Sequence, residues 1–203
     1  MTPPLFIVLE GIDGSGTTTQ LPLLERHLER RGRRAYTTRE PSQGPVGRLL
    51  RELLLGGHKL PTGAPADGLA MALLFAADRR DHLTREIEPA LAAGADVVSD
   101  RYLMSSLAYQ AQEADRAWVA GLARELRQPD LTLLLDVPVS VAAARRRAAG
   151  RPDERYDADD VQSRVASRYR ELCAADPRAL ILDASRSIEE VAAAIATAVD
   201  KLL

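Results

Sequence analysis

The chain has 203 residues, of which 46% are hydrophobic, and a formal net charge of −2, so it can bury a sizeable core within one domain. A charge this close to zero excludes a strong non-specific attraction to nucleic acid or to a membrane surface. The single cysteine, Cys173, excludes an internal disulfide and favours a reducing, cytoplasmic setting, while the first apolar run is too short for a signal sequence or a membrane span.

Strand and helix patterns alternate along the chain. Apolar runs predict strands at residues 5–10, 34–41, 95–102, 130–138 and 179–185. Amphipathic patterns predict helices at residues 17–31, 46–55, 69–94, 105–127, 139–150, 160–175 and 187–203. Pro22 is expected to distort the first helix or shift its start, and Pro89 to bend the third. The alternation predicts a single α/β domain over residues 1–203, with a five-stranded parallel sheet covered on both faces.

The stretch "EGIDGSGTTTQ", residues 10–20, nearly matches the phosphate-binding loop pattern G-x-x-x-x-G-K-[ST]. Gly11, Gly16 and Thr18 are in register, but Thr17 occupies the position of the lysine. The loop follows a buried strand and precedes a helix, where backbone N–H groups and the helix N-terminus favour phosphate. The pattern predicts a nucleotide-phosphate site; a glycine-rich turn without a ligand is the alternative.

Three further segments follow in order: "TREP" (residues 38–41), "LLFAADRRDHL" (73–83) and "DRYLMSSLAYQ" (100–110). Together with "EGIDGSG" they resemble thymidylate kinases over nearly the whole chain. The resemblance implies a P-loop NTPase-like fold, which is a three-layer, doubly wound sheet with a mobile lid. It also implies transfer of the ATP γ-phosphoryl group to thymidine monophosphate for dTTP synthesis, with Mg²⁺ as cofactor. It further implies a homodimer without nucleic-acid or membrane partners, and a cis peptide bond at Glu40–Pro41.

The resemblance assigns donor binding to the loop itself, through Gly11, Ile12, Asp13, Gly14, Ser15, Gly16, Thr17 and Thr18. Thr18 would coordinate Mg²⁺, and Asp100 would hold it through water. Asp13 would orient the acceptor sugar's 3′-hydroxyl and touch the metal shell. A capping or turn role is the alternative for Asp13 and Asp100.

The same resemblance implies that Arg39 and Arg101 bind the acceptor phosphate. Arg51 would be a further contact, and its neighbour Arg48 is the competing position. Glu40 would also reach this site. Guanidinium forks suit phosphate oxygens, although solvated surface arginines are the ordinary alternative. An acceptor phosphate is already ionised, so no strong general base is needed. The three histidines are expected to be surface or helix residues without a catalytic role: His27, His58 and His82.

The thymine pocket implied by the resemblance combines a flat apolar surface with directed polar groups. Phe75 would stack on the base, and Arg79, one helical turn on, would donate to a thymine carbonyl. Ser106 and Gln110 match base-contacting positions, and Tyr109 would pack on the deoxyribose. Ordinary core packing is the alternative for the two aromatic residues.

Residues 150–159 resemble the mobile lid of these kinases. Some family members carry a catalytic arginine in the phosphate-binding loop, where this chain has Gly14, and others carry it in the lid. Here "RYD" supplies Arg155, with Arg151 nearby, and lid closure would exclude water and deliver positive charge.

Thr17 leaves the phosphate-binding loop without its cation, and neither lysine of the chain, Lys59 or Lys201, lies in a matched segment. The candidate replacements are Arg151, Arg155 and the run 145–147, with Arg155 expected to act. Two other functions remain open: a catalytically impaired, nucleotide-binding homologue with a regulatory or structural role, and a related nucleotide kinase.

Overall fold

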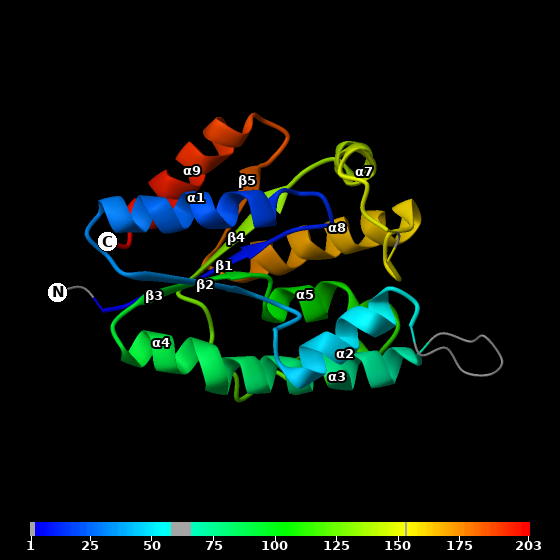
Figure 1. Ribbon diagram of the computed structural model, residues 1–203. Helices are drawn as coiled ribbons and strands as arrows, with labels where there is room; N and C mark the ends of the chain where they lie inside the picture. The colour runs from blue at the N-terminus through cyan, green and yellow to red at the C-terminus, as the bar shows by residue number, and fades with distance from the viewer. Residues whose placement is uncertain (1–2, 58–65, 153) are drawn as a thin grey trace.

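A computed structural model describes residues 3–57, 66–152 and 154–203 of the chain. Among these residues, five strands form one parallel sheet in the order β2-β3-β1-β4-β5 (Figure 1). The strands are β1 Phe6–Glu10, β2 Ala35–Arg39, β3 Asp96–Asp100, β4 Leu131–Asp136 and β5 Ala179–Asp183. The predicted parallel α/β sheet is thereby confirmed, because every neighbouring pair of strands runs in the same direction.

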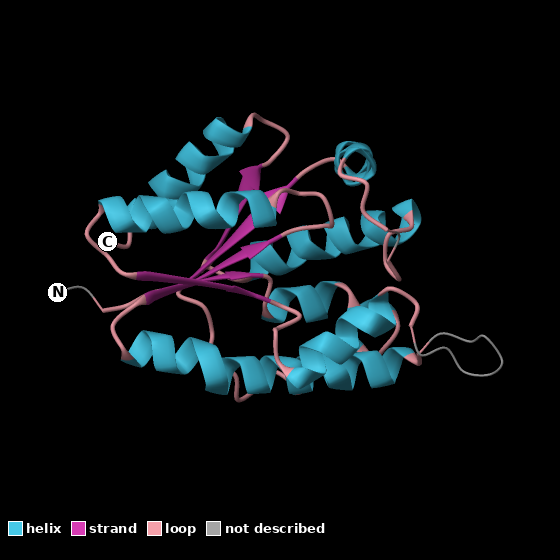
Figure 2. Cartoon of the chain, viewed as in Figure 1, coloured by secondary structure: helices cyan, strands magenta, loops and turns pink. Residues whose placement is uncertain are grey.

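Helices cover both faces of the sheet, which gives three layers (Figure 2). Helices α1 and α9 pack together on one face, and α4, α5 and α8 lie on the other (Figure 1). Helix α7 packs against α8. Helices α2 and α3 pack against each other beside the sheet. The α-helices are α1 Thr17–Arg30, α2 Pro45–Leu54, α3 Gly68–His82, α4 Glu88–Ala92, α5 Leu103–Ala108, α6 Arg116–Gly121, α7 Val139–Ala148, α8 Asp159–Ala175 and α9 Ile188–Asp200.

The central strands are buried along their whole length. Every residue of β1 and β3 is buried, and β4 is buried as far as its last residue. A strand covered by helices on both faces has no solvent side, which is why its sequence reads as a continuous apolar run. The core between the layers is built mainly from these strands and the inward sides of α1, α8 and α9.

The long helix expected at residues 69–94 is interrupted before Pro89. A π-helical turn, η1 Leu83–Ile87, separates α3 from α4. Pro89 has no N–H to donate to the carbonyl of Arg85, and a locally widened turn accommodates this missing bond. The sequence predicted a bend near Pro89, and the structure has a π turn just before this residue. Helix α1, in contrast, begins at Thr17 and runs through Pro22 to Arg30.

Residues 105–127, which were predicted to be mostly helical, do not form one continuous helix. The segment forms α5, the 3-10 turn η2 Gln110–Gln112 and then α6. A new helix starts at α6 because the Asp115 side chain accepts a hydrogen bond from Trp118 N at 2.8 Å, which is the geometry of an N-cap.

The carboxyl ends of the parallel strands lie at one edge of the sheet, where ligands bind in open α/β folds. Glu10, Arg39, Asp100 and Asp136 end β1 to β4, and the loops that follow them build the site described below. Within the described ranges, none of the helices has the length and apolarity that crossing a membrane requires.

Candidate active site

The loop between β1 and α1 has the backbone of a phosphate cradle. Gly14 and Gly16 adopt φ values of 89° and 105°, which glycine tolerates and other residues rarely adopt. A Cβ on Gly11 would lie 2.4 Å from Ser15 Oγ. Thr17 begins α1, so the N-terminal N–H groups of that helix border the loop.

The loop forms one end of a cavity of about 790 Å³. Phe75, Tyr109 and Gln110 also line this cavity, although they come from other segments of the chain. Seven arginines line it against four carboxylates, all among the described residues: Arg39, Arg51, Arg101, Arg145, Arg146, Arg151 and Arg186, with Asp13, Glu40, Asp100 and Glu154. This positive excess suits a ligand that carries several phosphate groups.

Asp13 and Arg101 form an ion pair in the cavity wall. Asp13 accepts hydrogen bonds from Arg101 Nη2 at 2.9 Å, Tyr109 Oη at 3.0 Å and Gln162 Nε2 at 3.1 Å. Burial alone would raise the pKa of Asp13, but the Arg101 charge and these hydrogen bonds together hold that pKa below its ordinary value. Arg101 has a φ of 74°, a costly backbone conformation of the kind found at functional sites.

Glu10, the last residue of β1, stabilises the segment that follows Arg101, and the sequence analysis did not predict this role. Its carboxylate accepts hydrogen bonds from the backbone N–H groups of Tyr102 and Ser105 at 3.1 Å each, from Ser105 Oγ at 2.7 Å and from Tyr169 Oη at 3.0 Å. Burial raises the pKa of Glu10 despite these bonds. The available signal was an acidic residue at the end of an otherwise apolar buried strand.

Thr18 and Asp100 meet where a phosphate-bound cation would lie. Thr18 Oγ1 donates to Asp100 Oδ2 at 2.7 Å, and the buried Asp100 Oδ1 has no hydrogen-bond partner among the residues described. An unpaired carboxylate oxygen beside a hydroxyl fits a hard cation. Nowhere in the described part of the chain do three or more His, Cys, Asp or Glu side chains converge on a metal site. Such a sparse donor set resembles the way Mg²⁺ is held, through one or two carboxylates, water and substrate phosphates.

Arg39 and Arg51 enter the cavity from β2 and α2. Neither forms an ion pair with a carboxylate in the described part of the chain. Arg51 donates to the carbonyl oxygens of Ser42, at 2.8 Å, and Pro41. Burial lowers the pKa of Arg51, and the like charge of Arg39 lowers it further. Arg48 is exposed and outside the cavity wall, so the geometry favours Arg51 as the phosphate contact of the two.

Arg79 and Ser106 lie behind the cavity wall rather than in it. Arg79 Nε and Nη2 donate to Glu40 Oε2 at 2.9 and 2.7 Å, and Arg79 Nη1 donates to Ser106 Oγ at 3.0 Å. Only Glu40 of these three lines the cavity. The direct contact of Arg79 and Ser106 with a base stays a prediction, although the Arg79 guanidinium is already bound by a buried carboxylate.

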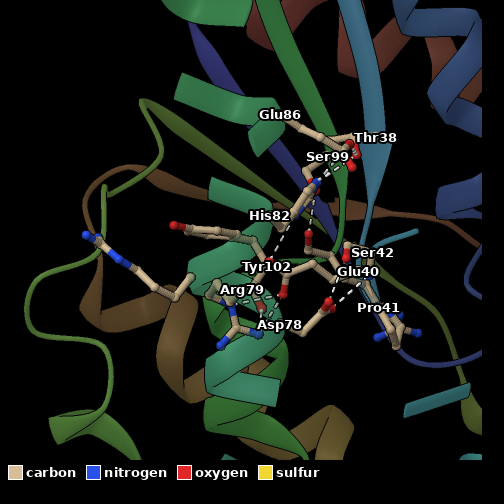
Figure 3. A network of polar contacts seen from close by, with 12 residues as sticks. Thr38, Glu40, Pro41, Ser42, Asp78, Arg79, His82, Glu86, Ser99 and Tyr102 are labelled. Carbon is tan, nitrogen blue, oxygen red and sulfur yellow. Dashed lines mark hydrogen bonds and ion pairs between the residues drawn. The ribbon is translucent and has the colours of Figure 1, made fainter. Parts of the chain in front are cut away.

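His82 extends this buried network (Figure 3). Its Nδ1 lies 3.3 Å from Glu40 Oε1 and its Nε2 lies 2.7 Å from Thr38 Oγ1, which donates to Glu86 Oε2 at 2.8 Å. His82 is a helix residue, as expected, at the end of α3, but it is buried, with only 1% of its surface exposed. The sequence signal was its spacing from Arg79, one helical turn away on α3. His58 lies outside the described residues.

Asp78 anchors the loop after β2 (Figure 3). Its two carboxylate oxygens accept hydrogen bonds from Ser42 Oγ at 2.6 Å and Ser42 N at 2.8 Å. The same loop contains the cis peptide bond at Glu40–Pro41, as predicted. Because Arg51 donates to carbonyl oxygens of this loop, Asp78 positions Arg51 indirectly.

The two lid arginines are in different surroundings. Arg151 lines the cavity and pairs with Glu154 at 3.3 Å. Arg155 is outside the cavity wall, with Nη2 3.0 Å from Glu113 Oε2 and Nη1 donating to Ala66 O at 2.7 Å. That Arg155 supplies the missing positive charge stays a prediction; here its guanidinium is paired with the Glu113 carboxylate and does not line the cavity.

Comparisons with known proteins agree with this geometry. A family model described as thymidylate kinase matches residues 9–195. The chain is 41% identical to the probable thymidylate kinase of Thermococcus kodakarensis, over 98% of each chain. It is 44% identical to the thymidylate kinase of Leifsonia xyli, over 98% of this chain and 95% of the relative. Identity to the thymidylate kinase of Bifidobacterium longum is 42%, over 98% of both.

Proposed function

The chain belongs to the thymidylate kinase family and is a kinase acting on thymidine monophosphate, and from this premise we propose how its residues perform the transfer. The observation behind the proposal is one cavity lined by the phosphate-binding loop, by the flat side chain of Phe75, and by Arg39 and Arg51, which form no ion pair within the described residues. Such a cavity accommodates two nucleotides with their phosphates toward the arginines.

ATP is the phosphoryl donor, and its phosphates lie against the loop from Gly11 to Thr18. Backbone N–H groups of the loop and of the first turn of α1 bind the phosphate oxygens. Thr18 Oγ1 and, through water, Asp100 would hold Mg²⁺. Bound there, the ion would supply positive charge that offsets the charge of the donor phosphates.

Arg39, Arg51 and Arg101 hold the acceptor phosphate. One of its oxygens attacks the γ-phosphorus in line, the bond from that phosphorus to the β,γ-bridging oxygen breaks, and ADP leaves. The attacking oxygen carries no proton at neutral pH, so no side chain has to act as a base. Asp13 holds the Arg101 guanidinium in place and faces the acceptor sugar, where it orients the 3′-hydroxyl.

Phe75 stacks on the thymine, Gln110 bonds its polar edge and Tyr109 packs on the deoxyribose. Arg79 and Ser106 act indirectly. Arg79 holds Glu40 in the cavity wall, and Ser106 accepts a hydrogen bond from Arg79. The lid around residues 150–159 closes over the phosphates and brings Arg151 toward the transferred group.

The proposal extends to a homodimer acting in the cytoplasm. Large hydrophobic side chains are exposed on the neighbouring helices α2 and α3 and just after α2, which supports an interface there: Leu49, Leu55, Leu69 and Leu73. ATP and thymidine monophosphate are intracellular metabolites, and the buried Cys173 thiol needs no oxidising environment.

A steady-state assay with ATP, Mg²⁺ and a series of nucleoside monophosphates tests the activity. Thymidine monophosphate should exceed the cytidine and guanosine monophosphates in kcat/KM by more than tenfold, since a pocket that hydrogen-bonds one base leaves polar groups unpaired with another. Equal use of all acceptors would reject the base pocket, and binding of ATP without transfer would favour the impaired homologue.

Analytical ultracentrifugation of the same sample tests the dimer.

A further inference from the structure

The phosphate-binding loop contains no positively charged side chain. Thr17 stands at the lysine position, is 6% exposed and lies in the cavity wall. Its hydroxyl can donate one hydrogen bond but carries no charge. Phosphoryl transfer depends on cations placed around the β- and γ-phosphates, so a positive charge has to reach this place from another element of the fold.

Helix α7 packs directly against the loop. A Cβ on Gly14 would lie 2.4 Å from the carbonyl oxygen of Ala142, so only glycine permits this approach. Arg145 follows Ala142 by one helical turn and is therefore on the same side of α7. Its Nη1 lies 3.4 Å from Ser15 O, and its side chain lines the cavity.

Ion pairing distinguishes Arg145 from three other candidates for this charge, Arg146, Arg151 and Arg155. Arg146 is committed to Asp157, at 3.2 Å, and to Asp13 O at 2.6 Å. Arg151 and Arg155 are paired with Glu154 and Glu113. Arg145 has no carboxylate partner among the described residues, and its one hydrogen bond, to a loop carbonyl, is long.

We propose that Arg145 replaces the missing loop lysine as the cation on the donor's β- and γ-phosphates, with its guanidinium moving from Ser15 O to the phosphate oxygens when ATP binds. The inference rests on the proposed function, since it concerns the same donor site. It assigns the compensating charge to a rigid helix rather than to the lid.

A rescue experiment tests the assignment with the purified full chain. Arg145→Ala should lower kcat/KM by about 10²–10³-fold, and Arg145→Lys should retain most of the activity. Adding Thr17→Lys to the Arg145→Ala variant should restore at least about tenfold, while Thr17→Lys in the unsubstituted chain should gain far less, because one cation then already occupies the site. Arg147→Ala is the matched control: Arg147 is exposed on the same helix and outside the cavity, and its activity should be unchanged.

A loss below about threefold in Arg145→Ala, or an equal gain from Thr17→Lys in both backgrounds, would overturn the assignment. The affinity for a fluorescent ATP analogue provides a second readout, which Arg145→Ala should weaken at least about tenfold and Arg147→Ala should not. If the unsubstituted chain phosphorylates no nucleoside monophosphate, the proposed function fails, and this binding measurement alone still decides whether Arg145 holds the donor phosphates.

Discussion

Arg79 Nη2 lies 2.7 Å from Glu40 Oε2, and each of the two side chains is only 3% exposed. A buried pair of this kind stabilises a fold only while both partners are present, because a lone buried charge is strongly unfavourable. The pair connects the loop that follows β2 with α3, the helix that carries Phe75.

Removal of one partner should therefore lower the free energy of unfolding substantially. Glu40→Ala is expected to lower the free energy of unfolding by about 3–5 kcal/mol, since it leaves the Arg79 charge buried. Glu88→Ala is the control, because it breaks an exposed pair with Arg127 and should cost at most about 1 kcal/mol. Urea denaturation of both variants makes the comparison, and similar losses would contradict the prediction.

Asp78 should matter for acceptor binding although it does not line the cavity. Asp78→Asn places an amide N–H₂ against one of the two Ser42 donors and loosens the loop whose carbonyls hold Arg51. Losing a hydrogen bond to a charged group costs about 1.5–3 kcal/mol, so KM for thymidine monophosphate should rise about 10- to 100-fold, with a smaller change in kcat. Asp81→Asn, which alters an exposed pair on the same helix, should leave both constants unchanged. A fall in kcat at constant KM would argue against a positioning role.

The pair of Thr18 and Asp100 predicts how activity responds to magnesium. If Asp100 holds Mg²⁺ through water, Asp100→Asn should raise the Mg²⁺ concentration for half-maximal activity about 10- to 100-fold. Asp136→Asn makes the same substitution at the end of β4, where the carboxylate is paired with Arg170, and should not shift the titration. A magnesium titration of the kinase reaction measures this, and coincident curves for the two variants would remove Asp100 from the metal site.

Glu10 should impose a pH dependence on stability. Burial raises the pKa of Glu10 above its ordinary value, so the native state retains this proton at pH values where the unfolded chain has lost it. The contribution of Glu10 to the free energy of unfolding is thus largest below pH 4.5 and falls as the pH rises from there through the higher native pKa.

Glu10→Gln removes that titration while it preserves the shape of the side chain. The decline in stability above about pH 4.5 should be shallower in this variant than in the unsubstituted chain. Urea denaturation across this range gives the two profiles, and parallel profiles would show that Glu10 does not titrate differently in the folded state.

The sequence by itself determined the strands, the phosphate-binding loop and the family. These features depend on local backbone geometry: a buried strand needs a continuous apolar run, and a turn with positive φ needs glycine at positions such as Gly14 and Gly16. Such requirements depend only on neighbouring residues, so they can be predicted from the sequence. Near Pro89 the sequence predicted a disturbance of the helix, and the structure shows a π turn. At Asp115 the sequence analysis missed the helix N-cap that the structure shows.

Only the tertiary structure decided which charged side chains are free to act. Arg145 and Arg155 are both arginines in a polar part of the sequence, yet one contacts the loop and the other is neutralised by Glu113. Likewise, Glu10 and His82 acquire their partners from elements far away in the chain. A long side chain can reach many partners, and the partner it finds depends on how distant elements pack, which is a property of the assembled layers rather than of the local sequence.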